Sequence, residues 1–221
     1  MFEGQQPAYG VAGPSRWQPR ATYGLLAAIV AVYVAELVAL SRSEALFTRI
    51  FVIDTDWPHR PWSLLTSTLS HGSIGHLFLN GLFLYFFGPV VERIIGRGPR
   101  GTLRFVGLFL ATGALSGIAQ VHLEAAFGGT GGALGASGAL MALFGVVWVL
   151  LPREKVLFWG IAPMPMWGVG LLYVLLDILG AANTEDRVGN FAHLAGLGFG
   201  AAYGAWARYD LRRRGLRLVR S

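Results

Sequence analysis

The feature that most constrains this chain is a succession of six apolar stretches separated by more polar connections. They cover residues 23–40, 76–95, 103–120, 137–151, 156–180 and 190–208. A helix needs about 20 apolar residues to cross the hydrocarbon core of a bilayer, and most of these stretches are long enough. Only 14% of the residues are charged, against about a quarter in soluble domains. We therefore predict an all-α, polytopic membrane protein with six transmembrane helices.

The fourth stretch is the shortest, and its start carries a serine. A helix from Ser137 to Leu151 would be about 22 Å long, whereas the hydrocarbon core is about 30 Å thick. Its end is well marked by the sequence Pro152-Arg153-Glu154-Lys155. The missing length therefore falls at its beginning, and we expect Ser137 to lie below the membrane surface.

Basic residues predict the orientation of the chain. The formal net charge is +6 and the pI is about 10.2, but the basic residues lie in short segments between apolar stretches, which is typical of membrane topology signals and not of nucleic-acid binding. One side holds Arg16, Arg20, Arg93, Arg97, Arg100, Arg104, Arg153, Lys155, Arg208, Arg212, Arg213, Arg214, Arg217 and Arg220, and the other only Arg42, Arg49, Arg60 and Arg187.

This bias places both termini in the cytoplasm. We predict a cytoplasmic tail over residues 1–22, a membrane domain over residues 23–208 and a basic cytoplasmic tail over residues 209–221. The last tail either binds anionic lipid headgroups or serves as a topology signal alone.

Three apolar stretches begin with residues able to carry chemistry. His76 and Asn80 open the second stretch, Ser137 the fourth and His193 the sixth. These three helices run in the same direction, so the four side chains should lie at similar depth in the outer half of the membrane. Ionisable and polar groups inside a bilayer are costly, which makes each a functional candidate.

The residue types fit acyl transfer. A serine hydroxyl is a weak nucleophile that needs an adjacent base, and histidine suits this role near neutral pH. The free N–H groups at a helix start, together with Asn80 and His76, could stabilise the oxyanion. Each residue also has a simpler interpretation: a helix cap for Ser137, a packing residue for His193 and interhelical contact for Asn80.

Small residues predict a close contact between the fourth and sixth helices, although such spacing also packs many membrane helices without catalysis. They are Gly138, Ala139, Ala142 and Gly145 in one, and Gly196, Gly200 and Gly204 in the other. Of the two acids considered, Glu92 is interpreted as a structural ion pair with Arg93. Asp177 could orient His193, but we expect it to be a solvated helix end.

Together these patterns resemble the rhomboid family of intramembrane serine proteases. The resemblance rests on Gly135-Ala136-Ser137-Gly138, on His76-Leu77-Phe78-Leu79-Asn80, and on Ala192-His193-Leu194-Ala195-Gly196 followed by Gly200. It covers about residues 23–208. It implies a six-helix bundle with a catalytic dyad of Ser137 and His193 that needs no acid.

The resemblance further implies an oxyanion site formed by Asn80, His76 and the Ser137 N–H, and substrates that are transmembrane helices cut near their outer end. Gly135, Gly138, Met141, Gly196 and Gly200 would support the site. Two departures stand out. Trp62-Ser63 replaces a common Trp-Arg pair, so Arg60 could anchor the first loop instead. Met141 stands where many members carry an aromatic residue under the base.

We predict an intramembrane serine endopeptidase in the plasma membrane of a prokaryote. Its partners would be transmembrane substrates and the bilayer, with no nucleic acid, cofactor or metal; the sequence leaves the oligomeric state open. The alternatives are a non-catalytic rhomboid-like protein that binds transmembrane helices for quality control, and a small transporter. Helix breakers in the fifth stretch suggest a hinged substrate gate over residues 166–180 or a static kink: Gly160, Pro163, Pro165, Gly168 and Gly170.

Overall fold

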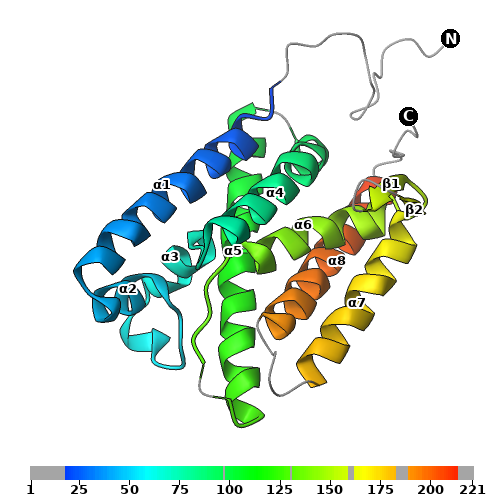
Figure 1. The fold of residues 1–221 in the computed structure, drawn as a ribbon. Helices are drawn as coiled ribbons and strands as arrows, with labels where there is room; N and C mark the ends of the chain where they lie inside the picture. Colours follow the sequence, from blue (N-terminus) through cyan, green and yellow to red (C-terminus); the bar gives the residue numbers. More distant parts are fainter. Residues whose placement is uncertain (1–17, 97, 130, 159–161, 183–188, 214–221) are drawn as a thin grey trace, which may run out of the picture.

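The computed structural model describes residues 18–96, 98–129, 131–158, 162–182 and 189–213. Residues 1–17 and 214–221, which make up most of the two predicted tails, and Gly160 of the predicted hinge lie outside them. The described chain is mostly helical (Figure 1). Its elements are α1 (Arg20–Arg42), α2 (Glu44–Phe51), η1 (Trp57–His59), α3 (Ser63–Leu69), α4 (Ile74–Ile95), α5 (Gly98–Ala126), α6 (Ser137–Leu150), β1 (Lys155–Phe158), β2 (Ala162–Pro165), α7 (Met166–Ala182) and α8 (Asn190–Arg213).

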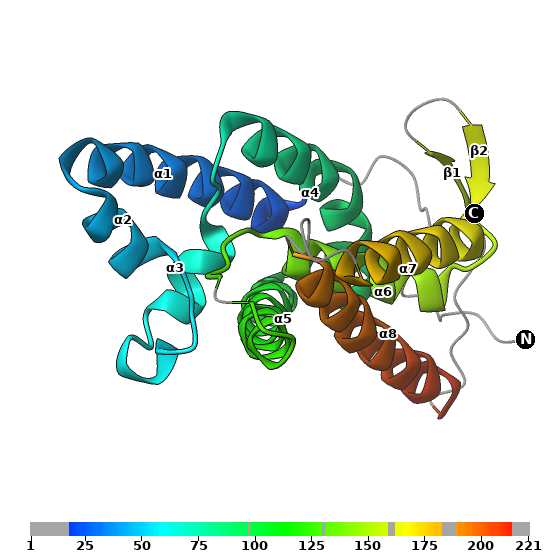
Figure 2. The same cartoon turned by 60° about the horizontal axis from the view of Figure 1, so that its bottom comes forward.

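The short helix α6 forms the centre of the fold (Figure 2). It packs against α4, α5, α7 and α8, most extensively against α8. Every residue from Gly138 to Val147 is buried, so α6 has no face free for lipid over this length. Its 14 residues correspond to about 21 Å. The first residue of this enclosed helix is Ser137.

Three of the six predicted spans are confirmed as helices long and apolar enough to cross a membrane: α1, α4 and α5. The helices α6 and α7 are apolar but shorter. The outer face of α1 exposes Val30, Val34 and Leu37, each more than half accessible. Such a continuous apolar face is stable against lipid and unfavourable against water, so the chain is a membrane protein.

The predicted span over residues 156–180 is wrong before residue 166. Lys155–Phe158 and Ala162–Pro165 form an antiparallel hairpin, and the helix begins only at Met166. Proline lacks an N–H and clashes with the preceding turn of a helix, so Pro163 and Pro165 disfavour a helix over β2, and α7 begins directly after Pro165. The predicted static kink inside one helix over residues 156–180 is therefore wrong, because Pro163 and Pro165 lie in β2. The gate over residues 166–180, which fall in α7, stays a prediction. The fold is also not strictly all-α.

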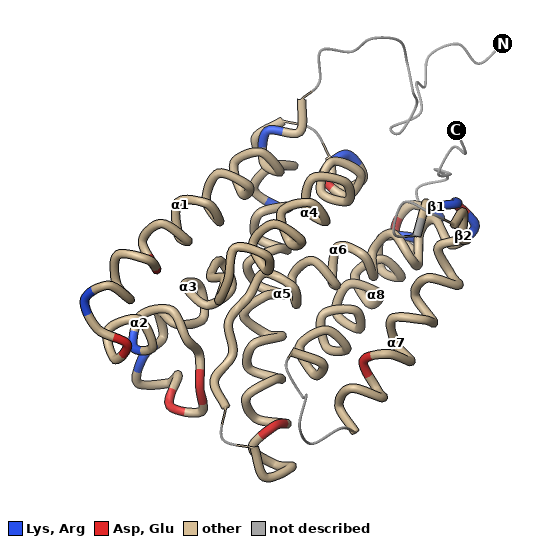
Figure 3. The backbone as a smooth tube through the Cα atoms, in the orientation of Figure 1, with Lys and Arg blue, Asp and Glu red and all other residues tan. Residues whose placement is uncertain are grey.

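Basic residues gather at the end of the bundle where α1 begins and where α4 and α8 end (Figure 3). At this end Glu92 of α4, 4% exposed, accepts hydrogen bonds from Ala21 N, Thr22 N and Thr22 Oγ1. The first N–H groups of a helix have no intrahelical partner, and a carboxylate there also complements the helix dipole. Glu92 thus fixes α4 to the start of α1, which is a structural role. The predicted ion pair of Glu92 with Arg93 stays a prediction.

Candidate active site

The segment before Ser137 is fixed by backbone pairing. Ile53 and Ala133 exchange two hydrogen bonds of 2.9 and 2.7 Å, and Gly135 N donates to Ser67 O at 2.8 Å. Gly135 has φ +136°, a conformation that glycine adopts far more readily than other residues. The turn of the chain at Gly135 then starts α6 at Ser137, as the sequence predicted.

The same glycine brings α4 to Ser137. A Cβ atom on Gly135 would lie 3.1 Å from Nε2 of His76 and 3.6 Å from Oγ of Ser137. The imidazole of His76 and the hydroxyl of Ser137 therefore border the same point. Ser73 caps α4, because its Oγ accepts from His76 N at 3.1 Å, and this cap fixes His76 in the first turn.

Asn80 lies one turn after His76 and is 8% exposed. Its Nδ2 atom is buried and has no hydrogen-bond partner among the described residues. Leaving a buried donor without an acceptor costs about 1–3 kcal/mol of stability. We therefore expect Asn80 Nδ2 to donate to an acceptor on a bound substrate. The first turn of α6 likewise has no side-chain cap, which leaves backbone N–H groups available at Ser137.

His193 lies in the first turn of α8. Contacts with Gln120 of the neighbouring helix α5 and with Phe127, which directly follows α5, hold this turn in place. Ala192 N donates to Oε1 of Gln120 at 3.0 Å, and Gln120 is 2% exposed in α5. The ring of Phe191 stacks on Phe127 with centroids 5.7 Å apart. A Cβ on Gly138, the residue after Ser137, would lie 3.5 Å from O of Ala192, the residue before His193. The structure thus brings His76, Ser137 and His193 into one region, as their predicted depth required.

Backbone contacts between α6 and α8 are very close. A Cβ on Gly196 would lie 2.1 Å from Gly138 O, and one on Gly200 would lie 1.9 Å from Ala142 O. A Cβ on Gly138 would lie 2.5 Å from Cβ of Ser116. The predicted close contact between these helices is therefore confirmed, and only glycine fits at these positions.

The partner of His193 is Asp177, the residue that the sequence offered only as the less favoured alternative. The Nδ1 atom of His193 lies 3.0 Å from Oδ1 of Asp177, and Asp177 is 6% exposed, so the interpretation of Asp177 as a solvated helix end is wrong. Among the described residues no hydrogen bond joins Ser137 to His193. Catalytic hydrogen bonds often tighten only with substrate bound. Met141 is 5% exposed and belongs to the buried apolar core, so it packs in the interior and does not face lipid.

A second layer behind His76 was also missed. Glu36 of α1, 2% exposed, accepts from His71 N at 3.0 and 3.1 Å. The ring of His71 meets that of His76 edge-on with centroids 5.1 Å apart. Burial and, secondly, the neighbouring His76 lower the pKa of His71 to about 4, so His71 is neutral at pH 7. Glu36 is the only acidic residue in the apolar stretch 23–40, and this position could have marked it as a buried functional residue.

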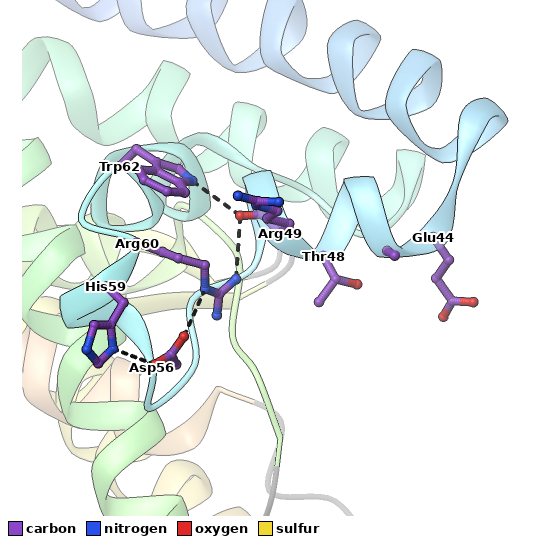
Figure 4. A pocket seen from close by; sticks show the side chains of 8 residues that line it. Glu44, Thr48, Arg49, Asp56, His59, Arg60 and Trp62 are labelled. Carbon is purple, nitrogen blue, oxygen red and sulfur yellow. Dashed lines mark hydrogen bonds and ion pairs between the residues drawn. The ribbon is translucent and has the colours of Figure 1, made fainter.

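An open depression of about 750 Å³ lies elsewhere, on the first loop (Figure 4). Arg60, offered by the sequence as an alternative loop anchor, pairs with Asp54 and donates to Arg49 O at 3.4 Å. Trp62 Nε1 donates to the same carbonyl at 3.2 Å. The lining residues are Glu44, Ala45, Thr48, Arg49, Asp56, His59, Arg60 and Trp62. None of them belongs to the region around Ser137.

Comparison with known proteins adds independent findings. The Rhomboid domain family matches residues 58–209. The chain is 34% identical over 161 residues to "RHOMBOID-like protein 12, mitochondrial" of Arabidopsis thaliana, covering 66% of this chain and 46% of that protein. It is 26% identical over 192 residues to "Rhomboid protease GlpG" of Pectobacterium atrosepticum, covering 86% and 63%.

A third relative is "Presenilin-associated rhomboid-like protein A, mitochondrial" of Danio rerio, with 30% identity over 145 residues that cover 63% of this chain and 36% of that protein. The chain thus spans 36–63% of the length of these curated relatives. Two of the three are named as mitochondrial and one is bacterial, so the relatives do not support one compartment over the other.

Proposed function

Because the chain belongs to the rhomboid family, we propose that it is a serine endopeptidase that cleaves transmembrane segments of membrane proteins within the bilayer. Ser137 is the nucleophile and His193 the base. The observation that carries the proposal is the meeting of Ser137 Oγ and the His76 ring at Gly135, one helical turn along α4 from Asn80, whose Nδ2 donor is buried and unpaired. A hydroxyl beside unpaired donors is the arrangement that acyl transfer needs.

The reaction would follow from this geometry. As Ser137 Oγ bonds to the substrate carbonyl carbon, its proton moves to Nε2 of His193. The oxyanion accepts hydrogen bonds from the Ser137 N–H, Asn80 Nδ2 and the His76 ring, and the positive end of the α6 dipole favours the negative charge. Nε2 then returns its proton to the leaving amine, and water hydrolyses the acyl-enzyme. Gly135, Gly138, Gly196 and Gly200 allow the close approach on which this depends.

We also propose that all six apolar helices α1, α4, α5, α6, α7 and α8 cross the bilayer, with both termini in the cytoplasm and the membrane domain over residues 23–208. The basic end of the bundle (Figure 3) supports this orientation. A prokaryotic plasma membrane stays a prediction from sequence. Reporter fusions at residues 18 and 213 test the topology, and protease protection of either terminus from the cytoplasmic side would contradict it.

A second candidate function is non-catalytic binding of transmembrane helices for quality control. The observation that favours it is that two of the three relatives are named rhomboid-like and not protease. The presence of both Ser137 and His193 favours the enzyme, because a binding protein needs neither a nucleophile nor a base.

The decisive experiment uses the purified full chain in liposomes with a panel of single-span substrates. We expect Ser137→Ala and His193→Ala each to abolish cleavage while thermal unfolding stays unchanged, and the double variant to be no worse than either. Ser63 is a buried serine at the start of α3, where its N–H donates to Arg60 O on the first loop, so Ser63→Ala is the matched control. A fluorophosphonate should label the native chain and not Ser137→Ala. Cleavage by Ser137→Ala would contradict the proposal.

A further inference from the structure

One carboxylate lies on the face of α7 that packs against the rest of the bundle. Asp177 is 6% exposed, whereas Leu175, Leu176, Ile178 and Leu179 around it are all more than half exposed. Residues three and four apart share one face of a helix, and this face also carries Tyr173 and Gly180. Asp177 thus points away from lipid, and an intramembrane acid is a functional candidate.

The contacts before and after Asp177 hold it against α8. One turn earlier, the ring of Tyr173 meets Phe144 of α6 at a centroid distance of 5.5 Å. One turn later, a Cβ on Gly180 would lie 2.7 Å from both Oδ1 and Nδ2 of Asn190 in the first turn of α8. The position of Asp177 relative to His193 is therefore set by packing on both sides.

The hydrogen bond to His193 fixes where the imidazole proton lies. Oδ1 of Asp177 is 3.0 Å from Nδ1 of His193, and an ionised carboxylate only accepts hydrogen bonds. Nδ1 must therefore carry the proton, which leaves Nε2 with a lone pair. Nε2 borders Gly189, whose missing Cβ would lie 3.4 Å away, so no side chain of that residue covers it.

We propose that Asp177 is a positioning residue that keeps His193 in the Nδ1-protonated tautomer, ready to accept the Ser137 proton at Nε2. The inference rests on the proposed function. During attack, the Oγ–H proton moves to Nε2 while the Nδ1 proton stays in its hydrogen bond to Asp177. The carboxylate then also stabilises the positive charge that the imidazole acquires.

The competing role is purely structural, in which Asp177 only joins α7 to α8. Kinetics and spectroscopy separate the two. In Asp177→Asn the amide can donate its N–H to Nδ1, which places the proton on Nε2 and blocks the base. We expect kcat to fall by about 10²–10⁴, with KM within about twofold because the residue touches no substrate. Asp177→Leu should lose activity as well, without favouring the Nε2-protonated tautomer.

The tautomer can be read directly from ¹⁵N shifts of histidine-labelled full chain in detergent micelles, with His193→Gln to assign the signals. We expect an Nδ1-protonated His193 in the native chain and an Nε2-protonated one in Asp177→Asn. The matched control is Asp56→Asn, because Asp56 forms the same bond to His59 at 2.7 Å on the exposed first loop, far from α7 (Figures 1 and 4). It should keep full activity.

An Nε2-protonated His193 in the native chain would overturn the inference without the need for any variant. An unchanged kcat in Asp177→Asn would also overturn it. The same holds if Asp177→Asn loses activity only in proportion to its loss of thermal stability while the tautomer of His193 stays the same. Failure of the proposed function is a separate result, since it would appear as cleavage by Ser137→Ala and the tautomer measurement does not depend on cleavage.

Discussion

Replacement of Gly200 by alanine tests whether the contact between α6 and α8 sets the site. The new Cβ would lie 1.9 Å from the carbonyl oxygen of Ala142 and 2.6 Å from its carbon. Both atoms belong to the backbone of a buried helix, so neither can rotate away. To reach ordinary van der Waals contact, α8 must move locally by about 1.5 Å, a form of overpacking.

The expected magnitudes follow from this displacement. Overpacking costs about 1–3 kcal/mol, and the higher helix propensity of alanine returns at most about 1 kcal/mol. His193 lies two turns before Gly200 on the same rigid helix and moves with it. Because a misplacement of about 1 Å can reduce a rate about 10²-fold, we expect a larger loss in cleavage than in stability.

The helix supplies its own controls. Gly198 has nothing within 4 Å of a built Cβ, and Gly204 is intermediate, with its nearest atom at 3.1 Å. Cleavage of one single-span substrate and thermal unfolding in the same detergent should rank the alanine variants in the order Gly198, Gly204, Gly200, from least to most affected. If Gly200→Ala is as active and as stable as Gly198→Ala, the close contact does not position the base.

Three further predictions concern single elements of the site. Asn80→Ala should lower kcat by about 10²–10³, the loss usual for one oxyanion donor, and an unchanged rate would leave Asn80 as a packing residue. Met141→Phe or Met141→Tyr should keep or raise activity, and Met141→Ala should lower it if Met141 supports His193, because it leaves a void in the core one turn after Ser137. If Met141→Ala loses stability but keeps its full rate, Met141 does not support the base. Because the chain has no cysteine, Gly180→Cys with Asn190→Cys can lock α7 to α8, and oxidation should block large substrates but not fluorophosphonate labelling. Full cleavage in the oxidised form would contradict a gate at α7.

The sequence by itself determined the elements whose signals are local. Apolar runs and their flanking residues predicted where five helices begin, to within five residues. In the structure these helices start at Arg20, Ile74, Gly98, Ser137 and Asn190. Small residues at four-residue spacing predicted the contact between Gly200 and Ala142, because one face of a helix is set by its period. Where the local pattern was ambiguous, as at Pro163 and Pro165, apolar composition alone was misread as helix and the β1–β2 hairpin was missed.

Only the tertiary structure decided which polar groups meet across helices. Asp177 and His193 are separated by a connection whose length does not fix how α7 turns about its axis, so the sequence could not tell a solvated acid from a partner of the base. The same holds for Glu36 with His71 and for Gln120 with Ala192. Hydropathy gives the depth and direction of a helix, whereas its rotation depends on side-chain packing such as that of Tyr173 on Phe144, which is a property of the assembled fold.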